Sequence, residues 1–182
     1  PPVSYDVLEY HLPLVRHWLT TNYLGAIDYN FYTFMPSGTE TLFAIAAAIN
    51  NNVGQPAKLM NFAILVSTAL LVAALTRKMG ASRTIALLAA AIFCTHNTTM
   101  RIYVDAFADM GAAMYAVASA LALMLWRQNK SWWFIVLAGL LAGFAMGAKS
   151  SIAGILIAPS LIAIGIALFV DWKQARSQEG PR

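Results

Sequence analysis

The stretch "SWWFIVLAGLLAGFAMGAKSSIAGILIAPSLIAIGIALFV", residues 131–170, contains a single charged side chain, that of Lys149. Uncharged runs also occupy residues 59–76 and 110–126. Each run approaches or exceeds the ~18 apolar residues that are typical of a membrane-spanning helix. Only 11% of all residues are charged, compared with about 25% in an ordinary soluble domain. The sequence therefore predicts an all-α integral membrane protein.

The chain divides into three parts by polarity. Residues 1–56 form a polar and aromatic first segment, residues 57–171 form the membrane region, and residues 172–182 form a tail. The membrane region contains five predicted spanning helices, at 57–76, 84–98, 104–126, 132–148 and 151–170. The second is short, because only Ile85 to Cys94 is continuously apolar.

The distribution of positive charge favours counting that short second span. With it, one side of the membrane holds eight of the 12 Lys and Arg residues: Arg77, Lys78, Arg83, Arg127, Lys130, Lys173, Arg176 and Arg182. Without it, the loops at 77–83 and 127–130 would face opposite compartments. Cytoplasmic loops carry an excess of Lys and Arg, so we expect five spans with this side and the tail in the cytoplasm. The protein is then a multi-pass protein of the inner (plasma) membrane.

The opposite side gathers most of the remaining polar residues. It holds six of the eight acids, the three histidines and the four remaining Lys and Arg residues: Asp6, Glu9, Asp28, Glu40, Asp105, Asp109, His11, His17, His96, Arg16, Lys58, Arg101 and Lys149. Polar chemistry is thus concentrated on one face of the membrane. We expect a site that faces the periplasm or the exterior.

The first segment contains two predicted helices that lie in the membrane interface. Apolar residues recur at helical spacing over 6–21, and tyrosine and tryptophan side chains there suit the interface. A second helix is expected over 38–49, opened by a capping box in which Glu40 follows Ser37 by three residues. Its apolar residues are too few to cross a bilayer, so the first segment is predicted to be a non-cytoplasmic loop.

Asp105 and Asp109 are the strongest candidates for chemistry. They lie one helical turn apart at the outer end of a predicted span, and small residues follow them. Acids there are costly if they face lipid, and small residues let such a face pack against other helices. An ion pair between Asp105 and Arg101, four residues earlier, is the structural alternative.

Lys149 lies between two spans on the side that holds these acids. Its ammonium group could bind a phosphate, or it could simply extend to the interface as long basic side chains do. In the first segment, Asp6, Glu9 and His11 equally suit the polar face of an interfacial helix. His96 either faces a polar cavity or caps a helix.

A divalent metal remains an open alternative, and no metal site is assigned. Carboxylate and imidazole groups such as those of Asp6, Glu9, His11 and His96 are suitable ligands, but their spacing matches no metal motif. No basic cluster with interleaved aromatic residues occurs. The net charge of +4 therefore gives no reason to expect a nucleic-acid partner.

Four blocks of sequence, in order, resemble the bacterial GT-C glycosyltransferases, which are related to protein mannosyltransferases and aminoarabinose transferases. The blocks are "YDVLEYHLPLVRHWL" (5–19), "YNFYTFMPSGTETLF" (29–43), "RIYVDAFADM" (101–110) and "AGLLAGFAMGAKSS" (138–151). The resemblance implies a GT-C-like bundle of helices and a polyprenyl-phosphate sugar as donor. It also implies that the chain lacks the family's first span and everything after its sixth.

The resemblance places the family's two essential acids on Asp6 and Asp105. Many relatives have adjacent acids in the first motif, whereas Val7 follows Asp6 here. The expected activity is transfer of a hexosyl or pentosyl group to a hydroxyl on a glycan, lipid or protein, with Asp6 as general base and Asp105 as its partner across a cavity. The expected substrate-binding residues are Glu9, His11, Glu40, His96, Arg101, Asp109 and Lys149.

Two other classes of function fit a chain of this composition. A transporter or flippase fragment tends to carry charges near the bilayer midplane and paired repeats, and this chain has neither pattern. A non-catalytic membrane scaffold would not explain why acids and a lysine gather on one side. A membrane glycosyltransferase that contacts membrane lipid is therefore the favoured prediction.

Overall fold

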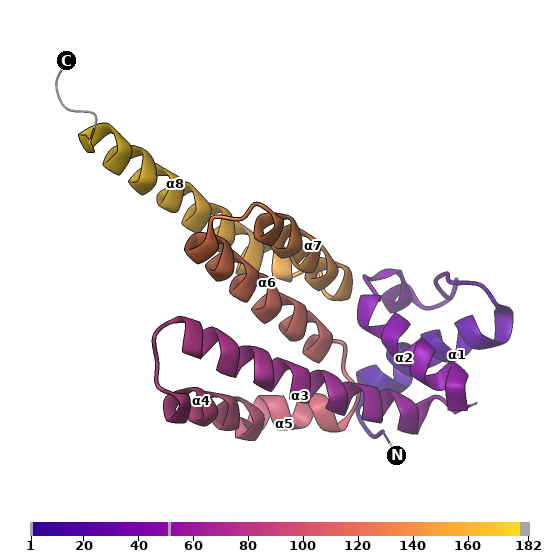
Figure 1. Ribbon diagram of the computed structural model, residues 1–182. Coiled ribbons are helices and arrows are strands. Elements are labelled where there is room, and N and C mark those ends of the chain that lie inside the picture. The colour runs from indigo at the N-terminus through magenta and orange to yellow at the C-terminus, as the bar shows by residue number, and fades with distance from the viewer. Residues whose placement is uncertain (1, 51, 179–182) are drawn as a thin grey trace.

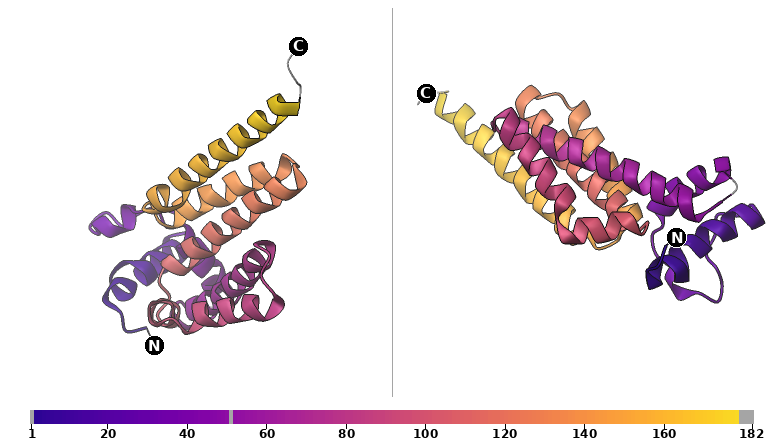
Figure 2. Two further views of the ribbon diagram at one scale, coloured as in Figure 1. Left: turned by 90° about the vertical axis from the view of Figure 1, so that its left-hand side faces the viewer. Right: turned by 90° about the horizontal axis from the view of Figure 1, so that it is seen from below.

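The computed structural model describes residues 2–50 and 52–178, and within them the chain is helical with no strand. The elements of the first segment are η1 (Val7–His11), α1 (Leu12–Thr21), η2 (Phe31–Phe34) and α2 (Gly38–Asn50). The later elements are α3 (Gly54–Lys78), α4 (Arg83–Thr95), α5 (Asn97–Val104), α6 (Asp109–Asn129), α7 (Trp133–Ala148), η3 (Ala153–Ile157) and α8 (Ala158–Gln178). The predicted all-α membrane fold is confirmed. The first-segment helices α1 and α2 lie at one end of the longer helices (Figures 1 and 2).

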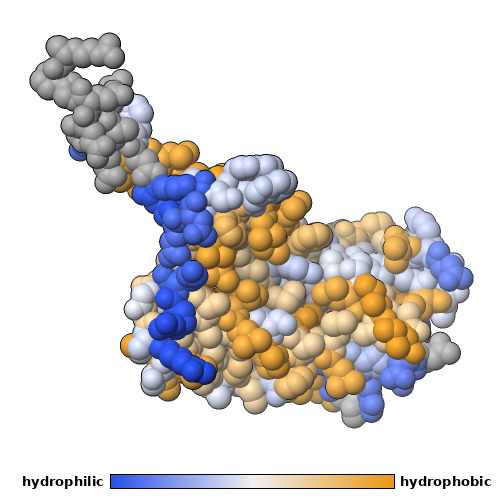
Figure 3. Space-filling view, in the orientation of Figure 1, coloured by the Kyte–Doolittle hydropathy of each residue, from blue (hydrophilic) through white to orange (hydrophobic). Residues whose placement is uncertain are grey.

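Within residues 2–50 and 52–178, three helices are long and apolar enough to cross a membrane: α3, α6 and the stretch Ala153–Val170. The pair α4 and α5, bent by 61°, counts as a fourth if it forms one broken span. Helix α7 has 16 residues, or ~24 Å at the usual rise, which is less than the ~30 Å hydrocarbon core. Five spans therefore remain a prediction. Hydrophobic residues (orange) form most of the surface between the more hydrophilic ends of the molecule (Figure 3).

The two basic loops lie together, as the charge distribution predicts. Helix α3 ends just before Gly80, whose φ of +93° suits a residue without a Cβ. Ser82 caps α4 by accepting a hydrogen bond from the N–H of Ile85. Gln128 then donates to the carbonyl oxygen of Lys78, 3.3 Å away, which joins the end of α6 to the end of α3.

The chain breaks where the sequence predicts an uninterrupted span over 104–126. Helix α5 ends at Val104, Ala106 takes a φ of +58°, and α6 begins at Asp109. The buried amide of Asn61 on α3 donates to the carbonyl oxygens of Ile102 and Tyr103 at the end of α5, and the Phe107 N–H also donates to that of Ile102. Contacts from another helix thus stabilise a break that no local Gly or Pro signals.

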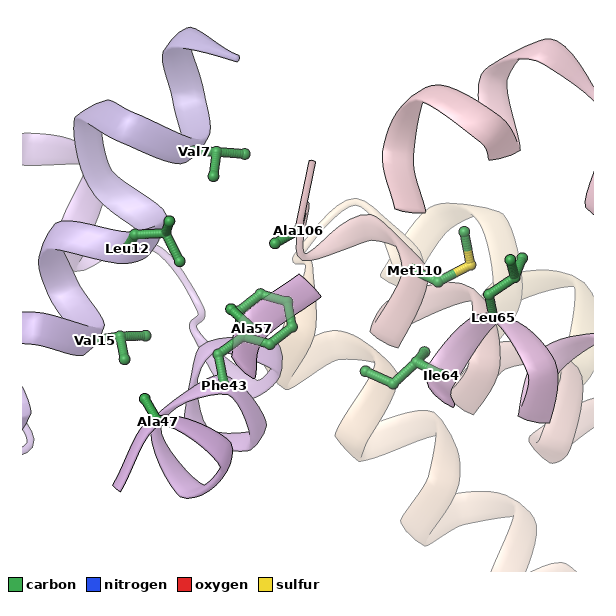
Figure 4. Close-up of a cluster of buried hydrophobic side chains, with 10 residues drawn as sticks. All are labelled: Val7, Leu12, Val15, Phe43, Ala47, Ala57, Ile64, Leu65, Ala106 and Met110. Atoms are coloured by element: carbon green, nitrogen blue, oxygen red, sulfur yellow. The ribbon is translucent and has the colours of Figure 1, made fainter. Parts of the chain in front are cut away.

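The first segment packs into the long helices through a shared hydrophobic core. Its ten buried residues are Val7, Leu12, Val15, Phe43, Ala47, Ala57, Ile64, Leu65, Ala106 and Met110. Figure 4 shows Val7, Leu12 and Val15 on one side of this cluster and Ile64, Leu65 and Met110 on the other. Because Phe43 is fully buried, its removal would cost about 3–5 kcal/mol. Burial therefore holds the helices of the first segment against the bundle.

Two close approaches set the position of α2. Thr39 donates to the carbonyl oxygen of Ala108, 2.9 Å away, and a Cβ at Gly111 would lie 2.3 Å from the Thr39 hydroxyl oxygen. A Cβ at Gly38 would lie 2.9 Å from the carbonyl oxygen of Gly147. Glycine at positions 38 and 111 therefore lets the start of α2 lie between the start of α6 and the end of α7.

Candidate active site

A cavity of about 150 Å³ lies where the first segment meets the start of α6 and the end of α7. Its polar lining includes Tyr10, His11, Ser37, Glu40, Asp109 and Lys149. These residues come from η1, from the start of α2, from the first turn of α6 and from the residue after α7. The cavity thus depends on the same close packing that holds α2 in place.

A buried pair of His11 and Glu40 forms one wall of this cavity. The Nδ1 atom of His11 lies 2.5 Å from Oε1 of Glu40, and the two residues are 5% and 3% exposed. The second oxygen of Glu40, Oε2, is buried and has no hydrogen-bond partner. The predicted capping box is therefore wrong, because the Glu40 carboxylate contacts His11 instead of reaching back to Ser37.

Asp109 and Lys149 form an ion pair at another part of the cavity wall. Asp109 begins α6, where a negative charge is favoured by the helix dipole. Lys149 follows α7 and is partly exposed. The lysine therefore does more than extend to the interface, because its ammonium joins the ends of two neighbouring helices.

Tyr10 adds a phenol to the cavity. Burial, reinforced by the negative charges of Asp6, Asp109 and Glu40, raises the pKa of Tyr10 to about 12. Its ring stacks on that of Tyr32, with ring centroids 5.3 Å apart. The Tyr10 hydroxyl therefore stays protonated at physiological pH and can donate a hydrogen bond. Sequence reasoning did not select Tyr10, although it directly precedes His11.

Asp105 lies outside the cavity lining. It is 3% exposed, and its two oxygens accept hydrogen bonds from the backbone N–H groups of Val3 and Ser4, at 2.8 Å and 2.5 Å. Its nearby cation is Lys58, at 4.0 Å, so the alternative of an ion pair with Arg101 is not observed.

The Asp105 carboxylate is held in its charged form. Burial by itself would raise the pKa of Asp105, but hydrogen bonds from the Ser4 hydroxyl and from the N–H groups of Val3 and Ser4 oppose it. Together with the Lys58 ammonium, they hold this pKa below its ordinary value of 3.8. Asp105 therefore anchors the stretch of chain that leads into η1.

The other predicted site residues are exposed at positions that do not line the cavity. Asp6 directly precedes η1, where its side chain makes no capping hydrogen bond, and Glu9 is on η1. His96 and Arg101 lie at the start and within α5. The structure thus brings together His11, Glu40, Asp109 and Lys149. Within residues 2–50 and 52–178, no group of three His, Cys, Asp or Glu residues is placed to hold a metal ion.

Comparison with protein families matches residues 16–179 to the dolichyl-phosphate-mannose-protein mannosyltransferases. The matched region includes Glu40, Asp109 and Lys149 of the cavity and helices α2 to α8. No curated protein and no solved structure matches the chain.

Proposed function

The chain belongs to the dolichyl-phosphate-mannose-protein mannosyltransferase family of GT-C membrane glycosyltransferases, which use a lipid-linked sugar donor, and we propose that its cavity binds the phosphate and sugar of a polyprenyl-phosphate donor. The sugar is then transferred to a hydroxyl on a glycan, lipid or protein. The reaction takes place on the non-cytoplasmic side of the inner membrane.

The observation that carries this proposal is the Lys149 ammonium at the cavity wall. A cavity with charged side chains in its wall, beside apolar helices, suits a ligand with a polar head and a lipid tail, since the tail can stay in the bilayer. Because Lys149 is partly exposed, its ammonium can move from Asp109 to a phosphate oxygen. In the transfer step the bond between the anomeric carbon and the phosphate oxygen breaks, and the ammonium stabilises the negative charge that develops on the phosphate.

Asp6 is the proposed general base. As the acceptor oxygen forms its bond to the anomeric carbon, its proton passes to the Asp6 carboxylate, and the lipid phosphate leaves with the bonding electrons. Asp6 does not line the cavity, but its charge contributes to the raised pKa of Tyr10 in the cavity wall. Its exposure beside that wall supports this role, because an acceptor can reach it. Asp105 supports Asp6 through the backbone: it fixes Val3 and Ser4 just before the base.

Assays of the full-length enzyme with a polyprenyl-phosphate sugar test both roles. We expect Lys149→Met to weaken binding of the lipid phosphate. We expect Asp6→Asn to lower the rate by about 10²–10⁴-fold while donor binding is retained. Asp28→Asn is the matched control, because Asp28 is an exposed acid of the same segment that does not line the cavity.

The pattern of losses identifies the base. If Asp6→Asn keeps most of its activity and Glu9→Gln loses it, the base is Glu9. If neither variant is impaired, the start of η1 acts only as an interfacial anchor. Donor binding by Lys149→Met at the affinity of the parent enzyme would refute the role of the ammonium.

A further inference from the structure

We infer that Glu40, held by His11, recognises the transferred sugar by accepting a hydrogen bond from one of its hydroxyl groups. This inference rests on the proposed function, since it concerns the sugar part of the same donor. It assigns the two walls of the cavity to different parts of the ligand. The ammonium of Lys149 binds the phosphate, and the carboxylate of Glu40 binds the sugar.

The unpaired oxygen of Glu40 is the first observation behind this assignment. Over residues 2–50 and 52–178, two buried side-chain atoms have no hydrogen-bond partner: Oε2 of Glu40 and Oδ1 of Asn61. Asn61 lies on α3, where its amide nitrogen donates hydrogen bonds to two carbonyl oxygens at the end of α5. Glu40 lines the cavity. Because a buried acceptor without a donor is costly, the Glu40 oxygen requires a donor, and the cavity is where a ligand can supply one.

The chemistry of the pair determines which ligand group fits. A carboxylate can only accept, so Nδ1 of His11 donates to Oε1 of Glu40 and fixes the orientation of the carboxyl group. The remaining oxygen needs a donor. A sugar hydroxyl is a donor, whereas the phosphate of the donor lipid offers acceptor oxygens and a like charge. Glu40 therefore selects the sugar and repels the phosphate.

The position of the pair in the fold agrees with a recognition role. His11 ends η1 and Glu40 is in the first turn of α2, 29 residues later. Both are more than nine-tenths buried, so neither side chain belongs to the solvated polar surface of the protein. The cavity also contains the rings of Tyr10 and Tyr32, which stack on each other. The pair thus presents a fixed acceptor beside aromatic surface, as a site for a hydroxyl-bearing ring requires.

Lipid-binding measurements on the full-length enzyme test the inference. The parent is given polyprenyl phosphate and the polyprenyl phosphates of mannose, glucose and arabinose. Single-deoxy analogues are then made of the sugar lipid that binds most tightly. We expect one deoxy analogue to bind the parent about 10- to 100-fold more weakly, because it leaves the buried carboxylate unpaired.

Two variants separate the sugar from the phosphate. Glu40→Gln keeps the shape of the side chain but weakens its acceptor, so it should bind the sugar lipid about 10- to 100-fold more weakly. It should bind polyprenyl phosphate at least as tightly as the parent does, because the variant lacks the charge that repels the phosphate. Lys149→Met should weaken the binding of both lipids. Asp28→Asn, at an exposed acid away from the cavity, should bind both lipids as the parent does.

Each outcome decides between the alternatives. If Glu40→Gln retains the parent's preference for the sugar lipid over polyprenyl phosphate, Glu40 does not recognise the sugar. If Glu40→Gln does not fold, the deoxy analogues bound to the parent enzyme decide the question. If every analogue binds within about twofold of the affinity of the unmodified sugar lipid, the inference is overturned, and the role of Lys149 in binding the phosphate is unaffected. If the parent binds no polyprenyl phosphate, with or without sugar, the proposed function fails and the inference fails with it.

Discussion

Replacement of Asp105 by Asn should release the chain that leads into η1. The carboxylate accepts from the N–H groups of Val3 and Ser4 in a buried position. An asparagine side chain of the same shape has one acceptor oxygen, so one N–H group loses its partner and the other keeps a neutral hydrogen bond. A hydrogen bond to a charged group contributes about 1.5–3 kcal/mol and a neutral one about 1 kcal/mol. The local loss is therefore about 2–5 kcal/mol.

Hydrogen exchange measures this loss directly. A change of about 2–5 kcal/mol in the free energy of local opening corresponds to roughly 30- to 5,000-fold faster exchange. We expect this acceleration in peptides that cover residues 2–10 of the full-length Asp105→Asn enzyme. The rest of the chain should exchange as in the parent. Activity should fall mainly in kcat, because Asp6 loses its fixed position while the cavity keeps its affinity for the donor.

Unchanged exchange in the Asp105→Asn enzyme would give Asp105 a different role. If Asp105→Asn loses activity but residues 2–10 exchange at the parent's rate, Asp105 contacts the substrate directly and does not act through the backbone. Arg101→Gln is the matched control. Arg101 is exposed and lies four residues before Asp105 on the same stretch of chain, so its replacement should leave exchange of residues 2–10 unchanged.

Three further predictions concern protonation, packing and topology. Burial raises the pKa of Tyr10 to about 12 from its ordinary value of 10.0. The stability that the neutral phenol contributes should therefore be complete below pH 10 and decline as the pH rises through 12. Ultraviolet titration should show that Tyr10→Phe removes the tyrosine that ionises at about pH 12. Gly38→Ala should destabilise the fold by about 1–3 kcal/mol, since the added Cβ would approach Gly147, whereas Gly139→Ala meets nothing within 4 Å and should unfold at the parent temperature or above. Met79→Cys, in a Cys94→Ser background, should resist an impermeant thiol reagent applied to intact cells, and labelling from outside would reverse the predicted orientation.

Membrane character and approximate helix positions follow from the sequence alone. A bilayer imposes its requirement residue by residue, because every side chain in the hydrocarbon core must be apolar or shielded. The run that ends at Ala148 and the run over 59–76 therefore identify helices without knowledge of their neighbours. The charge rule likewise placed the loops at 77–83 and 127–130 together, and the contact between Gln128 and Lys78 confirms that they are close.

The grouping of the site residues depends on tertiary structure. Glu40 reads locally as a capping residue, and only the packing of α2 against η1 shows that its partner is His11. Asp105 reads as the start of a span, yet its carboxylate binds backbone about 100 residues away in the chain, and the break beside it is stabilised by Asn61 of another helix. Helical periodicity reports which face of an element is apolar, but not which other element covers it. Composition thus determined that this chain forms membrane helices. Long-range packing decided which polar groups share the cavity. A buried hydrogen bond needs two partners, and the spacing of residues along the sequence does not show which distant residues meet.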